Sequence, residues 1–231
     1  MTALNTYQLL HIKDIEDPRI EEAVKLLVIV FKDDPISMAF NGGCPSKYAD
    51  IIYRAILRAT VISGQLHIAV NDDGLLVGTA CWFPPGVDCF SDDVQQEQGA
   101  KQFFELLAED NPPLLDWWLT KCLPANSDFA NSILAKSADE NVKLDNWTLY
   151  SFAVHPEYRR RGIGRQLITV GEVQAKNKGV KVIFEADNPK NVGIYKRLGY
   201  ENAGASKYIE GPPGCAGYNL YLMVKDPASA Q

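Results

Sequence analysis

Apolar positions along the first third of the chain change from helical spacing to strand-like runs. Apolar residues recur every three or four positions in residues 17–31 and again in residues 47–62, which predicts two amphipathic helices. The runs LHIAV and LLVGTACWF follow, separated by Asn71-Asp72-Asp73-Gly74. Two β-rich runs around an Asp-Gly turn predict a hairpin over residues 66–83.

The last third of the chain has the most regular pattern. Residues 147–154 and 180–186 predict strands, and residues 162–178 between them predict a helix whose small residues allow close packing on a sheet. A short helix over residues 191–198 and a final strand over residues 218–224 follow.

The middle of the chain is predicted to be helical in pieces over residues 92–138, because prolines interrupt the pattern. Two tryptophans, Trp117 and Trp118, stand side by side there. This pair fits either packing within the core or an aromatic wall over a substrate pocket.

Composition limits the classes of partner. The 231-residue chain has a net charge of −6, which argues against nucleic acid and is compatible with a cationic substrate such as an amine, although solubility alone also explains it. No apolar run predicts a membrane span, and the N-terminal residues do not resemble a signal peptide. Five scattered cysteines without a C-x-x-C pair, with only three histidines, predict reduced thiols in a cytoplasmic protein without a metal site.

The segment RRRGIG, residues 159–164, lies between a predicted strand and the start of a predicted helix. The first N–H groups of a helix have no intrahelical partner and favour an anion, and Gly162 and Gly164 let phosphate oxygens approach the backbone. The neighbouring Arg159, Arg160, Arg161 and Arg165 add positive charge, and one or two of them are expected to reach the ligand. The P-loop string is absent, and Leu167 stands where a dinucleotide fingerprint needs its third glycine.

The six residues satisfy the pattern [RQ]-x-x-G-x-[GA], and further segments follow them in order. The strand LYSFAVHPEY precedes, and the helix, VIFEA and NPKNVGIYKRLGY come after. This combination resembles the pyrophosphate loop and surroundings of the GNAT superfamily of N-acetyltransferases. The resemblance covers residues 145–225 well and the hairpin loosely. CWFPPG and the Trp-bearing insertion are similar to a small-molecule branch that includes puromycin N-acetyltransferase.

The resemblance implies a single α/β domain of the GNAT fold over residues 1–231. Its central sheet would be mixed, mostly antiparallel and twisted, with one splayed parallel strand pair, flanking helices and a helical insertion at about residues 86–140. The implied activity is acetyl-CoA-dependent acetylation of a primary amine of a small molecule, by direct attack in a ternary complex of a monomer or homodimer. Two alternatives stay open: acetylation of a protein or peptide, and a non-catalytic acyl-CoA-binding regulatory module.

The resemblance also implies which residues hold acetyl-CoA. The backbone groups of Phe152, Ala153 and Val154 would pair with the pantetheine arm like an added strand. The loop and helix start would hold the pyrophosphate; these residues are Arg159, Arg160, Arg161, Gly162, Ile163, Gly164 and Arg165. Asn188 and Asn191 lie where the family has an amide that binds the arm or caps a helix. Asn191 is favoured for the arm, and Asn188 suits a cap.

The catalytic residues implied by the resemblance are Tyr195 and Glu185. Tyr195 matches the tyrosine beside the CoA sulfur and would protonate the leaving thiolate, or else only pack on the arm. Glu185 would deprotonate the amine directly or through water, or else make a structural bond. His155 is a weaker base because its position usually faces away. Asp33 and Asp34 are further carboxylates that suit a cationic substrate, and the sequence does not rank them.

Overall fold

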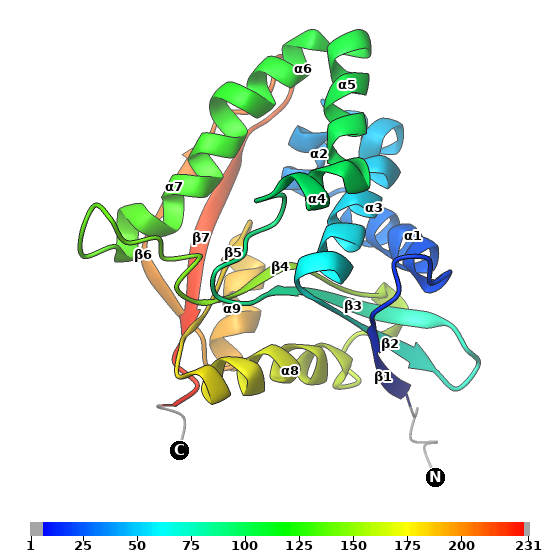
Figure 1. Ribbon diagram of the computed structural model, residues 1–231, viewed down its shortest axis with the longest axis vertical. Coiled ribbons are helices and arrows are strands. Elements are labelled where there is room, and N and C mark those ends of the chain that lie inside the picture. Colours follow the sequence, from blue (N-terminus) through cyan, green and yellow to red (C-terminus); the bar gives the residue numbers. More distant parts are fainter. Residues whose placement is uncertain (1–6, 229–231) are drawn as a thin grey trace.

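A seven-stranded sheet forms the centre of the protein in a computed structural model that describes residues 7–228 (Figure 1). The strand order is β1-β2-β3-β4-β5-β7-β6, and every neighbouring pair is antiparallel except β4 and β5. The strands are β1 (Tyr7–Ile12), β2 (Gln65–Asn71), β3 (Leu76–Phe83), β4 (Trp147–Val154), β5 (Val182–Ala186), β6 (Glu201–Ile209) and β7 (Tyr218–Lys225). The predicted mixed, mostly antiparallel sheet is confirmed. The predicted domain also includes residues 1–6 and 229–231, which lie outside the described residues.

The one parallel strand pair separates soon after it begins. β4 and β5 pair only at Trp147 with Val182 and at Thr148 with Ile183. Beyond these positions β4 runs on to Val154 with β3 on one side and, within residues 7–228, no strand on the other. The predicted splayed pair is therefore present, and it leaves one backbone edge of β4 open inside the sheet.

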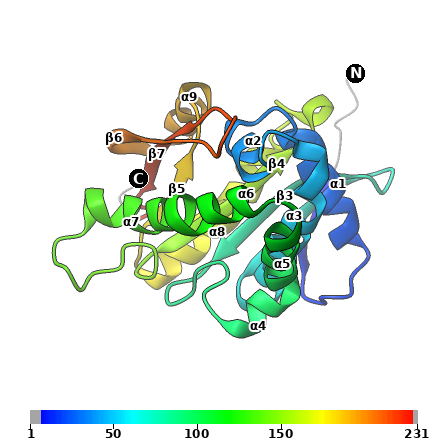
Figure 2. The ribbon, with the colours of Figure 1, turned by 90° about the horizontal axis from the view of Figure 1, so that it is seen from above.

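Helices cover both faces of the sheet (Figures 1 and 2). They are α1 (Arg19–Phe31), α2 (Pro35–Phe40), α3 (Pro45–Ser63), α4 (Asp93–Gln95), α5 (Lys101–Asp110), α6 (Pro112–Trp117), α7 (Leu123–Leu134), α8 (Ile163–Lys178) and α9 (Pro189–Arg197). α8 and α9 pack on one face, while α1, α3 and the helices between β3 and β4 pack on the other. Within residues 7–228, no helix combines the length and the apolar character needed to cross a bilayer.

Alternation along β5 decides which layer each of its side chains enters. Ile183 belongs to the core under α1 and α3, whereas Phe184 belongs to the core under α8. Because successive side chains of a strand point to opposite faces, Glu185 follows Ile183 toward the layer that contains the insertion. The sheet thus places Glu185 and Phe184 on opposite sides of the same strand.

The two adjacent tryptophans fasten the insertion to the rest of the protein. The Trp117 indole N–H donates to the Glu210 carbonyl at 2.7 Å, and the Trp118 indole N–H donates to the Phe40 carbonyl at 3.1 Å. Both tryptophans are buried, and the Trp118 ring packs on the Phe40 ring at 4.3 Å between centroids. Of the two interpretations that the sequence left open, core packing therefore describes this pair. Trp118 also fixes the end of α2, because it binds the Phe40 carbonyl.

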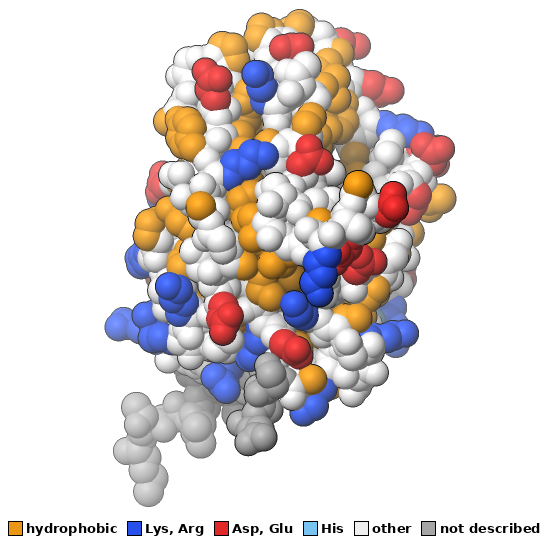
Figure 3. Space-filling view, turned by 90° about the vertical axis from the view of Figure 1, so that its left-hand side faces the viewer, with side chains coloured by type: hydrophobic (Ala, Val, Ile, Leu, Met, Phe, Trp, Pro, Cys, Tyr) orange, Lys and Arg blue, Asp and Glu red, His pale blue; other side chains and the backbone are white. Residues whose placement is uncertain are grey.

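Two elements have no counterpart in the predictions. α2 is a six-residue helix capped by Asp34, whose side chain accepts from the Ser37 N–H. β6 is a largely exposed edge strand of polar and small residues, so it lacks the apolar alternation that marks a strand. Seen from the left-hand side of Figure 1, the upper part of the molecule, where α6 and α7 lie, shows apolar side chains interspersed with acidic and basic ones (Figure 3).

Candidate active site

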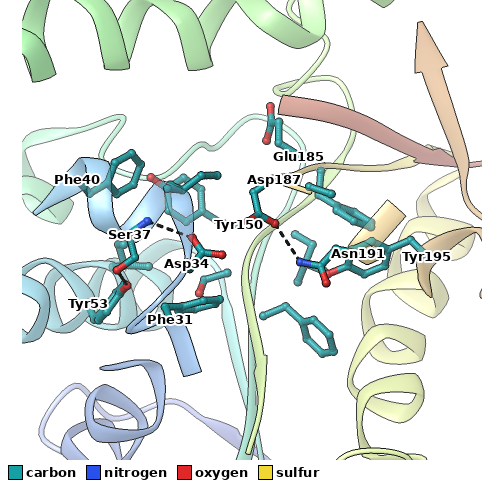
Figure 4. Close-up of a pocket in the computed structure, with 17 residues that line it drawn as sticks. Phe31, Asp34, Ser37, Phe40, Tyr53, Tyr150, Glu185, Asp187, Asn191 and Tyr195 are labelled. Carbon is teal, nitrogen blue, oxygen red and sulfur yellow. Dashed lines mark hydrogen bonds between the residues drawn. The ribbon is translucent and has the colours of Figure 1, made fainter. Parts of the chain in front are cut away.

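A cavity of about 170 Å³ lies beside the opening between β4 and β5 (Figure 4). Most of its wall is apolar or aromatic, and its polar side chains come from α2, α3, β4 and the segment from β5 into α9. The lining residues are Phe31, Asp34, Ile36, Ser37, Phe40, Tyr53, Ile56, Leu149, Tyr150, Ser151, Phe152, Phe184, Glu185, Ala186, Asp187, Asn191 and Tyr195. Tyr195, Glu185 and Asn191, all predicted as site residues, therefore meet at one cavity.

The open edge of β4 presents backbone groups from alternate residues. The His155 N–H donates to the Val77 carbonyl on β3 at 2.9 Å. Hydrogen-bonding direction alternates along an antiparallel pair, so the N–H and C=O of Ala153 turn toward β3 as well. Those of Phe152 and Val154 face the opening. Of the three residues predicted to pair with the arm, only these two offer backbone groups there, and the Val154 carbonyl also accepts from Arg159 Nε at 3.2 Å.

The RRRGIG segment forms an exposed turn that ends at the first residues of α8. Gly162 adopts φ +88° just before the helix. Arg160 adopts φ +63°, a backbone conformation that residues other than glycine rarely occupy. No side chain in the described part of the chain caps this helix start, so its first N–H groups keep their capacity to bind an anion. These features fit a diphosphate group.

The arginines of the turn differ in what they contact. Arg159 donates to the Val154 carbonyl, and Arg161 donates to the Glu157 carbonyl while its guanidinium lies 4.8 Å from the Tyr158 ring centroid. Arg160 and Arg165 are exposed. The first two therefore shape the turn, and which of the arginines reach a ligand stays a prediction.

Gly164 permits close contact between α8 and β4. A Cβ atom at this position would lie 3.1 Å from the Phe152 ring. We expect Gly164→Val to push Phe152 and the helix start apart, at an overpacking cost of about 1–3 kcal/mol, and to weaken CoA binding by roughly 5- to 150-fold. Calorimetric titration with CoA measures this. Asn177→Val, at an exposed position of the same helix, is the control and should bind CoA normally. If Gly164→Val bound CoA with unchanged affinity, the turn would not be part of the CoA site.

Two carboxyl groups face each other across the cavity, those of Asp34 and Asp187 (Figure 4). Asp34 caps α2 through the Ser37 N–H at 3.1 Å. Burial, and then a side-chain hydrogen bond with Asp187 and the charge of that residue, raise the pKa of Asp34 to about 7. Near neutral pH the ionised and the protonated forms of Asp34 are therefore present in comparable amounts. Asp33, the other carboxylate considered from the sequence, is exposed beside Lys32.

Glu185 is held in a buried ion pair. Its carboxylate lies 2.9 Å from Lys143 Nζ, and the side chains of the two residues are only 16% and 10% exposed. Burial by itself lowers the pKa of Lys143, but the charges of Glu185 and Asp88 outweigh it, so the pKa of Lys143 is raised. Lys143 remains charged and neutralises Glu185, which supports the structural alternative for this residue more than the role of a base.

Tyr195 projects from α9 toward the cavity beyond Asn191 (Figure 4). Its ring meets the Phe184 ring edge to face, with centroids 4.5 Å apart. Burial, and then the Asp187 carboxylate, raise the pKa of Tyr195. The phenol therefore keeps its proton throughout the neutral range and is available as a donor.

Asn188 and Asn191 take different roles. Asn188 caps α9 by accepting from the Asn191 N–H at 2.9 Å, the capping role anticipated from its position. The amide groups of both residues donate to Asp187 Oδ1, at 2.8 Å and 3.0 Å. His155 lies outside the cavity wall, where its Nδ1 accepts from the Glu157 N–H at 3.4 Å.

The sequence reasoning did not single out Asp187 or Lys143. Asp187 follows directly after the strand VIFEA, within a segment that was already matched, and its charge beside Asn188 was the available signal. Lys143 lies in the loop before β4 and no local pattern marks it.

Comparison with known proteins places the chain in a family. A family model described as the acetyltransferase (GNAT) family matches residues 44–200. The [ribosomal protein bS18]-alanine N-acetyltransferase of Escherichia coli is 33% identical over 76 residues, which is 32% of this chain and 51% of that protein. The chain thus spans about half the length of the curated relatives it matches.

Solved structures share the fold at low identity. Arylalkylamine N-acetyltransferase 2 of Aedes aegypti has a TM-score of 0.60 at 16% identity, covering 96% of this chain and 100% of that one. The polyamine N-acetyltransferase of Drosophila melanogaster has a TM-score of 0.58 at 14% identity, covering 95% and 100%. A Corynebacterium glutamicum protein described as histone acetyltransferase HPA2 and related acetyltransferase has a TM-score of 0.58 at 19% identity, covering 98% and 99%. Since the family model spans more than half of the chain, this protein belongs to the GNAT family of N-acetyltransferases.

Proposed function

We propose that this protein transfers the acetyl group of acetyl-CoA to a primary amine of a small molecule, by direct attack in a ternary complex. The observation that carries the proposal is the cavity itself. It adjoins the open edge of β4, it is largely apolar, and it holds the facing carboxyl groups of Asp34 and Asp187. A space of about 170 Å³ suits a small organic cation. The names of two fold neighbours, a polyamine and an arylalkylamine N-acetyltransferase, point to the same class of acceptor.

The residues that would hold acetyl-CoA run along one continuous path. The turn and the first N–H groups of α8 would bind the pyrophosphate, and the backbone groups of Phe152 and the N–H of Val154 would pair with the pantetheine arm. Asn191 stands beside Tyr195 at the cavity and would meet the end of the arm. One of the open β4 N–H groups would also polarise the thioester carbonyl.

Proton transfer follows from the chemistry of an amine. Acetyl-CoA supplies an acetyl thioester, and an ammonium group must lose a proton before its nitrogen can form the new C–N bond. We propose that ionised Asp34 takes this proton, in place of the paired Glu185. As the C–S bond breaks, Tyr195 protonates the sulfur and is reprotonated by the second proton of the nitrogen. The products are the acetylated amine, CoA and one proton.

The insertion supports a small acceptor over a protein segment. Trp117 and Trp118 bind it to the β6–β7 connection and to α2, so that α2 and Phe40 close one side of the cavity. Acetylation of a protein N-terminus, the activity named for the Escherichia coli relative, is the second candidate. The resemblance to the puromycin N-acetyltransferase branch stays a prediction.

Thiol release from acetyl-CoA, measured across a panel of acceptors, tests the proposal. The panel contains alkyl, aryl and polyamine primary amines together with peptides that carry free N-termini or lysines. We expect turnover with small amines. Turnover with peptides alone would replace the small acceptor by a protein. Tight CoA binding without acetylation of any acceptor would favour a regulatory module.

A further inference from the structure

Asp187 is held rigidly at the junction of β5 and α9. The residue is 8% exposed, and its Oδ1 accepts from the side-chain amides of Asn188 and Asn191 at 2.8 Å and 3.0 Å. Asn188 is itself fixed because it caps α9. Two donors on one oxygen fix the carboxylate plane, so the direction of the other oxygen is set before any ligand arrives.

The second oxygen of this carboxylate is not held by any fixed donor of the described residues. Asp187 Oδ2 is buried at the cavity and accepts from no N–H or hydroxyl group of these residues, and its neighbour Asp34 can donate to Asp187 only while it is protonated. A buried charged acceptor without a donor is unfavourable, and most such groups are paired in native proteins. When Asp34 is ionised, the donor to Asp187 is therefore expected to come from a molecule that enters the cavity.

The charges around the cavity identify that donor as a cation. None of the described residues in the wall is Lys, Arg or His, and Lys143, the cation behind the wall, is paired with Glu185. The other titratable groups that line the space are the carboxyl of Asp34 and the neutral phenols of Tyr53, Tyr150 and Tyr195. The site thus carries negative charge with nothing in its wall to neutralise it.

We propose that Asp187 binds the ammonium group of the acceptor through Oδ2, beside ionised Asp34, and so holds the amine where Asp34 takes its proton. This inference rests on the proposed function and adds to it a residue that touches the substrate. The Asp187 charge also favours the protonated form of Asp34, so a cation that enters between the two carboxylates favours ionised Asp34. Binding of the ammonium group thereby prepares its own proton acceptor.

The proposal predicts selectivity among amines. An acceptor that carries a carboxylate next to its amine brings a further negative charge close to Asp34 and Asp187. Like charges in a partly buried site repel strongly. The site therefore takes amines in preference to the corresponding α-amino acids.

Asp187→Asn tests the proposal because it removes the charge and keeps the size of the side chain. Two probes suit the aromatic wall: 2-phenylethylamine as acceptor, and its tertiary analogue N,N-dimethyl-2-phenylethylamine, which cannot be acetylated to a stable amide. Calorimetry on the full chain with CoA present gives the affinity of the tertiary amine and of neutral 2-phenylethanol. Asp33→Asn is the matched control, since Asp33 is exposed outside the cavity.

We expect Asp187→Asn to weaken binding of the tertiary amine by about tenfold or more, because a charge-assisted contact is lost. Binding of 2-phenylethanol should stay unchanged. The acidic inflection of kcat/KM for 2-phenylethylamine should move to lower pH. Asp33→Asn should change neither. Equal binding of the tertiary ammonium by Asp187→Asn and wild type would overturn the proposal. Because the binding measurement needs no turnover, it decides the role of Asp187 even if wild type acetylates no small amine, the result that would defeat the proposed function.

Discussion

Asp34→Asn is expected to lower kcat for amine acetylation by about 10²- to 10⁴-fold, the usual range for loss of a general base. Asparagine keeps the size of the side chain and its amide oxygen still accepts from the Ser37 N–H, so the cap of α2 remains. What disappears is a carboxyl group of the cavity wall whose pKa is raised to about 7. CoA binding should stay normal because Asp34 lies on the acceptor side.

The pH dependence of the wild-type enzyme gives an independent measure of the same residue. Burial and Asp187 raise the pKa of Asp34 above its ordinary value, so the carboxyl group holds its proton below about pH 7 and cannot accept another. The value of kcat/KM should therefore rise as pH increases through about 7. Asp34→Asn should lack this inflection. An Asp34→Asn enzyme with normal kcat would show that the base lies elsewhere.

Glu185→Gln separates the two carboxylates considered for this role. The substitution leaves buried Lys143 without its partner, and breaking a buried ion pair costs about 3–5 kcal/mol of unfolding free energy. We expect a clear fall in the denaturation midpoint of Glu185→Gln. The enzyme that remains folded should still show the inflection of kcat/KM near pH 7. If the inflection vanished in Glu185→Gln and persisted in Asp34→Asn, Glu185 would be the base.

Patterns within one segment predicted most of the fold. The spacing of apolar residues located α1, α3, α8, the β2–β3 hairpin and β4, because each of these elements buries a continuous face. The polar edge strand β6 and the six-residue α2 bury too little to leave a comparable pattern. Their places are set by neighbours, β7 for the strand and Trp118 for the helix.

The functional residues divide in the same way. Tyr195, Asn191 and the two glycines of the turn could be located because they belong to short motifs with fixed spacing. Two other contacts join segments that are far apart in the chain: Asp34 with Asp187, and Glu185 with Lys143. The sequence offered Asp33 and Asp34 equally, and only the cap of α2 turns one of them inward. Local patterns therefore locate the cofactor side better than the acceptor side.

Tyr195→Phe is expected to lower kcat by about 10²- to 10⁴-fold with little change in the affinity for acetyl-CoA. Phenylalanine keeps the edge-to-face contact with Phe184, so the wall of the cavity and the stability of the fold should be preserved. The lost group is a phenol whose raised pKa keeps it protonated, as a donor to the leaving sulfur must be. Single-turnover measurements at saturating acetyl-CoA isolate this step from product release.

Tyr200→Phe provides the matched control for this experiment. Tyr200 contacts the same Phe184 ring, with centroids 4.9 Å apart, but it does not line the cavity. Removal of its hydroxyl should leave the single-turnover rate near that of wild type. A similar loss in both variants would mean that the aromatic cluster acts only through packing. A normal rate in Tyr195→Phe would assign protonation of the sulfur to water, with Tyr195 reduced to a contact for the cofactor. A loss confined to Tyr195→Phe would identify the Tyr195 hydroxyl as the donor of the proton to the leaving sulfur, because Tyr195 lines the cavity and Tyr200 does not.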